Sequence, residues 1–124
     1  MRLRHLGLAA LGAVAATGAA SAHHAFNMYN NDQYTTLKGT VKEFTWQNPH
    51  AMIDYAVAMP GGAVEYWSVE CSAPNIIGRR GWSKTSLKAG DTLPLIIHPM
   101  KDGSKHGLLV SVTLANGTVL KDKN

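Results

Sequence analysis

Histidines stand at two places in the chain where their ring nitrogens could bind a metal ion. His23 and His24 follow the small-residue segment Ala20–Ala22, and His50 follows an Asn-Pro pair. Removal of a signal peptide after Ala22 would leave the free α-amino group on His23, whose amine and imidazole nitrogens can chelate one metal. His24 or His50 would complete a planar nitrogen set, which suits Cu(II). The sequence therefore predicts a transition-metal site made by His23, His24 and His50, with copper as the first choice.

The metal prediction tolerates other cleavage positions. Cleavage after Ala20 places His23 third in the mature chain, and cleavage after Ser21 places His24 third. A histidine in third position lets the terminal amine, the intervening amide nitrogens and the imidazole surround copper or nickel. The alternative is a solvated tail whose histidines are merely polar.

His50 has two further interpretations besides metal binding. It is a candidate general base, or its ring caps a turn or satisfies a backbone group near Pro49. No serine or cysteine stands at a recognisable nucleophile spacing, and Cys71 is expected to be a small core residue. Cys71 is also not followed at short range by the His and Met of a cupredoxin site. We therefore expect a protein without enzymatic activity.

The first 22 residues have the features of a secretory signal peptide. Arg2 and Arg4 precede the apolar run Leu6–Ala16, and the segment ends in Ala-Ser-Ala. This run is too short for a transmembrane anchor, which needs about 20 apolar residues. We therefore expect a bacterial protein that is periplasmic or secreted, with no stable membrane insertion after cleavage. Cleavage leaves 124 − 22 = 102 residues, which we divide into an arm, 23–36, and one folded domain, 37–124.

The charge and the cysteine content narrow the possible partners and cross-links. Loss of Arg2 and Arg4 lowers the formal net charge from +4 to 10 − 8 = +2. The remaining Lys and Arg residues are scattered among acids, so nucleic acid is not an expected partner. Cys71 is the sole cysteine, which excludes an intramolecular disulfide.

Alternating apolar residues predict a mainly β domain. The first strand begins at Leu37, and its apolar parity slips by one before Phe44, as in a β-bulge. It breaks at Asn48-Pro49, because Pro49 has no N–H for a strand ladder. The other predicted strands span 51–59, 64–71, 93–98, 108–114 and 118–120.

Two details of these elements can be checked directly. Ser72 is expected to cap a short helix that ends before Gly81. Leu108, Val110 and Val112 are expected to share one face of the fifth strand. The order of elements predicts a five- to six-stranded OB-like barrel with one short helix between strands three and four; a small β-sandwich is the alternative.

Tryptophans and arginines support a different class of function, the binding of a ligand or another envelope protein on the barrel face. Exposed rings can stack sugars, peptides or bases. Trp67 is expected to point inward and Trp46 borders the Asn-Pro corner, so core filling explains both. Trp82 either plugs the barrel end or presents its ring to solvent. The candidate contacts of such a metal-free adaptor are Trp46, Arg79, Arg80 and Trp82.

Six short segments stand out across the mature chain: His23–Phe26, Leu37–Val41, Trp46–His50, Arg79–Trp82, Ser86–Asp91 and Ser111–Gly117. On these segments the chain resembles a bacterial family of short exported proteins of unknown function, which have a His-His-Ala-Phe mature start and a Trp-x-Asn-Pro-His block. The resemblance implies an exported single domain and no established activity. It implies no role for His98 and His106, which stand where such proteins have a plainer linker.

Overall fold

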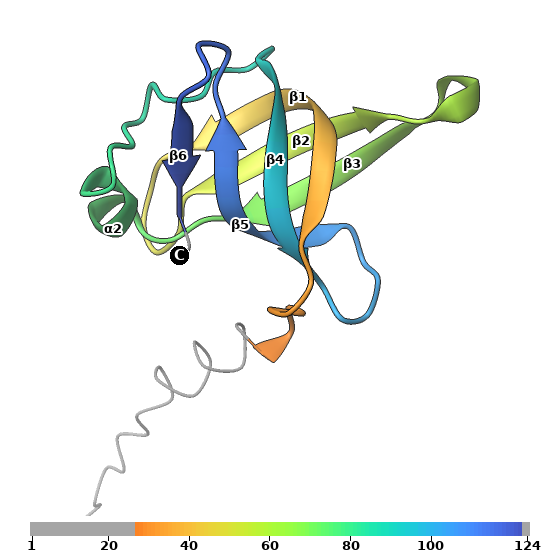
Figure 1. The fold of residues 1–124 in the computed structure, drawn as a ribbon, viewed down its shortest axis with the longest axis horizontal. Coiled ribbons are helices and arrows are strands. Elements are labelled where there is room, and N and C mark those ends of the chain that lie inside the picture. Colours follow the sequence, from red (N-terminus) through yellow and green to blue (C-terminus); the bar gives the residue numbers. More distant parts are fainter. Residues whose placement is uncertain (1–26, 123–124) are drawn as a thin grey trace, which may run out of the picture.

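Six strands and one short α-helix form the part of the chain that this computed structural model describes, residues 27–122 (Figure 1). The strands are β1 (Thr35–Thr45), β2 (Met52–Ala58), β3 (Val64–Glu70), β4 (Thr92–Pro99), β5 (His106–Thr113) and β6 (Val119–Lys121). A 3-10 turn, η1 (Pro60–Gly62), joins β2 to β3, and the helix α2 (Pro74–Gly78) lies between β3 and β4. The expected signal segment, His23 and His24 lie outside the described residues.

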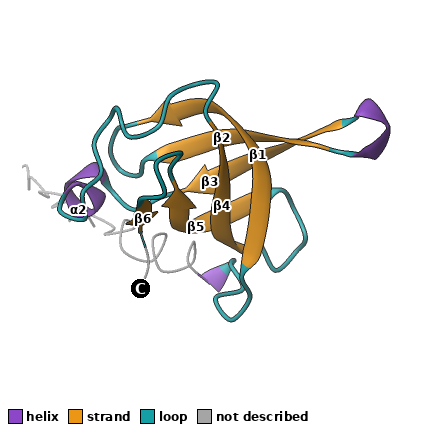
Figure 2. Cartoon of the chain, turned by 45° about the horizontal axis from the view of Figure 1, so that its top comes forward, coloured by secondary structure: helices purple, strands orange, loops and turns teal. Residues whose placement is uncertain are grey.

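The sheet closes on itself. Its order is β3-β2-β1-β4-β5-β6, and β3 also pairs with β5 in parallel through Ser68–Glu70 and His106–Leu108. Five strands therefore form a closed barrel, and β6 pairs with Ser111–Thr113 of β5, beyond the part of β5 that pairs with β3 (Figure 2). This confirms the predicted OB-like barrel, because a sandwich would leave β3 and β5 in separate sheets.

The predicted slip in β1 is a β-bulge. The pairing of β1 with β2 shifts between Val41 and Glu43, and Val41 is completely buried. The extra residue lets the first part of β1 pair with β4 and the second part pair with β2. One long strand thereby serves two sides of the barrel.

A second bulge contradicts the expected parity of β5. Ile96 pairs with Ser111 but Ile97 pairs with Leu109, so Val110 is an extra residue in the ladder. Leu109 and Val112 enter the core, whereas Val110 is only half-buried. The prediction that Leu108, Val110 and Val112 share one face was therefore wrong.

The residues around the corner and the helix also differ from expectation in detail. β1 ends at Thr45 and β2 begins at Met52, and the Asn48–Pro49 peptide bond between them is cis. Ala73 is the N-cap residue of α2 and makes no side-chain cap hydrogen bond. The Ser72 N–H instead donates to Asp122 Oδ2 at 2.7 Å, so Ser72 was wrongly predicted as the cap.

Trp82 fills the end of the barrel beneath α2. Its side chain is 3% exposed, its Nε1–H donates to the Lys121 carbonyl at 3.0 Å, and its ring lies 6.1 Å from that of Phe44. Trp46 is half-buried and stacks edge-on against Phe44. Of the two alternatives for Trp82, the structure has the plug.

Asp122, which follows β6, links this strand to the segment before α2, and its removal is expected to destabilise the fold. The carboxylate is fully buried, accepts the Ser72 N–H and lies 3.5 Å from Arg80 Nη1. Asp122→Ala should lower the free energy of unfolding by about 2 kcal/mol, measured by urea titration, because the partly buried Ser72 N–H loses its acceptor. Arg80→Ala should cost less, because Arg80 is exposed to water. Equal losses would show that the ion pair, rather than the N–H bond, carries the effect.

Candidate functional site

A carboxylate on the outer surface of the barrel holds the groups around His50 together. Glu70 ends β3 and points outward, since its neighbours Val69 and Cys71 are in the core. Its Oε2 accepts a hydrogen bond of 2.9 Å from the Tyr29 hydroxyl, and its Oε1 lies 3.5 Å from His50 Nε2. Three separate segments therefore meet at one charged group.

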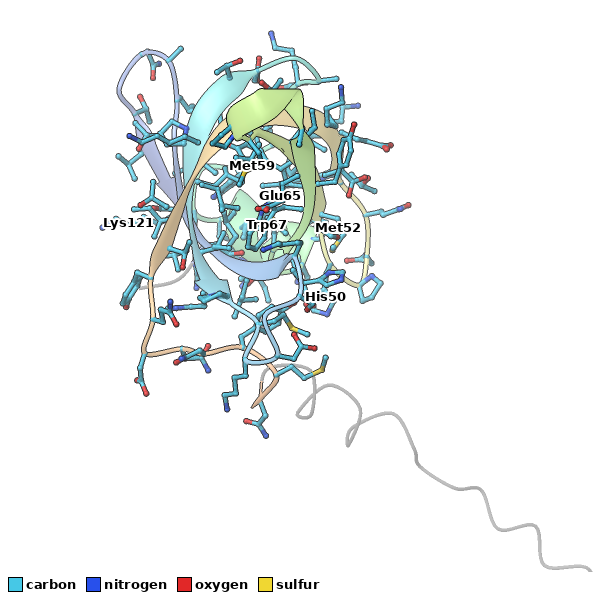
Figure 3. All side chains as sticks on the ribbon, turned by 90° about the vertical axis from the view of Figure 1, so that its right-hand side faces the viewer. His50, Met52, Met59, Glu65, Trp67 and Lys121 are labelled. Atoms are coloured by element: carbon cyan, nitrogen blue, oxygen red, sulfur yellow. The ribbon has the colours of Figure 1, made fainter. Side chains whose placement is uncertain are left out.

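His50 lies in the loop that joins β1 to β2, and its side chain is 36% exposed. Figure 3 shows it outside the ring of strands, whereas Trp67 lies within that ring. Within residues 27–122, its Nδ1 has no hydrogen-bond partner although it is shielded from solvent. The interpretation that the ring caps a turn or satisfies the backbone near Pro49 thus finds no bond to support it. A buried ring nitrogen without a partner lowers the stability of the fold by about 1–3 kcal/mol. The Nδ1 atom of His50 is therefore a candidate for binding a metal ion or another ligand.

The described part of the arm packs across the ends of β4 and β5. Tyr29 forms an antiparallel bridge with Met100, and the Lys101 N–H donates to the Met28 carbonyl at 2.9 Å. His98 is buried, with its Nδ1 2.8 Å from the Gln33 carbonyl oxygen and its ring 4.8 Å from that of Tyr34. His98 therefore holds the arm against the barrel. Its position in a strand did not predict this role.

A surface pocket of about 230 Å³ opens beside Glu70. Its lining residues are Met28, Tyr29, Glu70, Met100 and His106. None of them was predicted as a site residue. The one sequence signal for this pocket was that Glu70 alternates with apolar residues in its strand and so faces outward.

Tyr29 anchors the Glu70 carboxylate but is a poor metal ligand itself. Burial raises the pKa of the Tyr29 phenol well above its ordinary value, and the hydrogen bond to Glu70 and the charge of Glu70 raise it further. The phenol therefore stays protonated and donates. One oxygen of Glu70 is committed to Tyr29, and the other faces His50.

A second, larger hollow of about 420 Å³ lies alongside on the barrel surface. His106 lines both hollows, and Lys42, Asp54, Tyr66 and Trp67 line the larger one. The Trp67 Nε1–H donates to Glu65 Oε1 at 2.7 Å, and Figure 3 shows both side chains within the barrel mouth. The Lys105 ammonium lies 5.2 Å from the centre of the Trp67 ring, where a stacked ligand would have to displace it.

The predicted site residues are dispersed. His50 lies beside Glu70, whereas Trp46 and Trp82 pack at the barrel end near α2, and Trp82 presents no ring to solvent. Arg79 and Arg80 are exposed, and Arg80 pairs with Asp122.

Within residues 27–122, no three or more His, Cys, Asp or Glu side chains converge on one point. His23 and His24 lie outside the described residues, so their position relative to His50 is a prediction.

Comparison with known proteins places the chain in a family. In the described part of the chain, no helix has the length and apolar character needed to cross a membrane. No curated protein and no solved structure matches the sequence. Residues 11–111, most of the chain, match a family of unknown function, DUF6152. The chain therefore belongs to the DUF6152 family.

Proposed function

We propose that this protein is exported and binds copper, with its processed N-terminus and His50 supplying the nitrogen ligands. The observation that carries the proposal is His50, whose Nδ1 has no partner in residues 27–122 and whose Nε2 faces the Glu70 carboxylate. A carboxylate beside a ring nitrogen is a common arrangement at metal sites, where it orients the imidazole and raises its basicity. Imidazole suits copper as a ligand.

Chain length is compatible with a site shared between the N-terminus and His50. The described chain begins at Asn27, and the next residue, Met28, lines the pocket that contains Glu70. His24 precedes Asn27 by three positions, a distance of at most about 11 Å of extended chain. This length is compatible with the proposal that the α-amino group and the imidazoles of His23 and His24 share a metal with His50.

The hairpin of β2 and β3 favours a second candidate function, a metal-free adaptor. It projects beyond the barrel in Figure 1, and its exposed apolar side chains are Met59, Val64 and Tyr66. Tyr66 is 67% exposed. An apolar segment of another envelope protein could cover these side chains, either as an added strand or by packing on the ribbon.

A Cu(II) titration of the mature protein decides between the two functions. Isothermal titration calorimetry should give one Cu(II) per chain near neutral pH. Binding should weaken as the pH falls through about 6.5, because imidazole and amine nitrogens bind a metal only after losing their protons. Absence of copper uptake at micromolar protein would remove the metal function and leave the adaptor.

A further inference from the structure

Thioether side chains are the unexplained feature of the pocket beside Glu70. Met28 and Met100 both line it, together with His106. Met28 is 50% exposed, so it does not serve to fill the core. The proposed Cu(II) site uses nitrogen ligands and leaves both sulfur atoms without a role.

Backbone hydrogen bonds hold the three side chains on neighbouring segments. The Lys101 N–H donates to the Met28 carbonyl at 2.9 Å, and the Met100 N–H donates to the His106 carbonyl at 3.3 Å. The parallel pairing of β3 with β5 then sets His106 opposite Ser68, two residues before Glu70. Backbone hydrogen bonds therefore hold Met28, Met100 and His106 on adjacent segments. Met100 follows Met28 by 72 positions in the sequence, and His106 follows it by 78.

We propose that this thioether pocket binds Cu(I), with Met28, Met100 and His106 as ligands. Thioethers are soft ligands that select Cu(I), and imidazole also suits copper. A hard cation such as Mg²⁺ or Ca²⁺ needs several oxygen ligands, whereas Glu70, the one carboxylate among the described residues that line this pocket, has one oxygen bonded to Tyr29 and the other facing His50. Glu70 lines this pocket and also faces His50, so the Cu(I) site adjoins the proposed Cu(II) site.

The inference rests on the proposed function for the choice of copper and extends it to the reduced ion. A protein with adjoining sets of nitrogen and sulfur ligands retains copper in either oxidation state. The two sites depend on different residues, so each can be lost without the other.

Competition with a chromogenic Cu(I) chelator, under anaerobic conditions with ascorbate, tests the thioether site. The double variant Met28→Leu with Met100→Leu keeps the side-chain volumes nearly unchanged and should stay folded. Its Cu(I) affinity should fall by more than about tenfold. Substitution of residues that only support the ligands already lowers metal affinity by about 10–100-fold. Met59→Leu is the matched control, because Met59 lies by the hairpin turn, and it should leave Cu(I) affinity unchanged.

A direct readout removes the dependence on variants. With ¹³C-labelled methionine methyl groups, Ag(I), a redox-inert soft ion, should shift the NMR signals of Met28 and Met100 and leave that of Met59 in place. Unchanged Cu(I) affinity in the double variant, or Ag(I) shifts at Met59 alone, would overturn the thioether site. Cu(II) binding that survives in the double variant would leave the proposed function standing. Cu(I) binding without any Cu(II) binding would instead overturn the nitrogen site and support the thioether site.

Discussion

Blocking the N-terminal amine of the mature protein is expected to lower its Cu(II) affinity by about 100-fold or more. The amine is a direct ligand in every version of the proposed chelate. Loss of a residue that only hydrogen-bonds to a metal ligand already lowers metal affinity by about 10–100-fold. Acetylation of the α-amino group turns it into an amide, whose nitrogen lone pair is delocalised into the carbonyl group and is no longer that of a basic amine ligand. A four-residue Gly-Ser-Gly-Ser extension should act alike, because it moves both His23 and His24 away from the chain start. Calorimetric titration with Cu(II) measures both.

The design of the extension follows from the sequence. A single added residue would be a poor test, because it places His24 third and creates a new chelate. The same four residues added after Asn124 provide the matched control. Intact mass of the exported protein must first show loss of about 20–24 residues, the length of a signal peptide. Undiminished Cu(II) affinity after acetylation would exclude the N-terminal chelate.

His50→Ala distinguishes two forms of the same site. If the N-terminus meets His50, the substitution should weaken Cu(II) binding, and His106→Ala should not. If the first residues bind copper alone, both variants should bind Cu(II) like the unaltered protein. His98→Ala is a less suitable control, because His98 fastens the arm through Gln33 and Tyr34.

The barrel was predictable because its signals are local. Turn glycines such as Gly61, Gly103 and Gly117 have positive φ and separate short alternating runs. The bulge in β1 was visible because polar residues flank the apolar slip. The bulge in β5 was not, because Leu108, Leu109 and Val110 are all apolar and alternation cannot tell which is extra. Pairing with β4 decides that Leu109 enters the core.

The candidate site was only partly predictable, because distant segments build it. The Asn-Pro corner pointed to His50 by itself. Its neighbour Glu70 is bonded to Tyr29, which is 41 positions away, through the docking of the arm against the barrel. No local pattern in the sequence specifies the path of the arm. The sequence therefore does not predict that Met28 and Met100 line the same pocket.

The sequence is consistent with two positions of Trp82 for a related reason. Its place in the chain, after a predicted helix, is consistent with either a plug or an exposed ring. The Lys121 carbonyl that accepts its indole N–H belongs to β6, 39 positions later. Burial therefore depended on a strand whose docking the local sequence does not encode.

Gly39→Ala is expected to lower the free energy of unfolding by about 3 kcal/mol. β1 coils around the barrel at this point, and a Cβ on Gly39 would clash with the backbone carbonyl of Ala56 and with the Tyr55 ring. Backbone atoms cannot move aside as a flexible side chain can, so the pairing of β1 with β2 next to Gly39 would have to open. The Tyr55 hydroxyl, which donates to the Leu37 and Leu93 carbonyls, would be displaced with it.

Thermal unfolding followed by circular dichroism measures this effect, and the melting temperature should fall by roughly 10–20 °C. Gly78→Ala is the matched control, because the nearest atom to its added Cβ is a Trp46 ring carbon at 4.0 Å and it ends a helix. Alanine is favoured over glycine in a helix, so this control should keep or raise the melting temperature. A Gly39→Ala protein as stable as the Gly78→Ala protein would mean that β1 does not approach Ala56 of β2 this closely. The closed barrel that places Glu70 beside His50 would then need a different strand path.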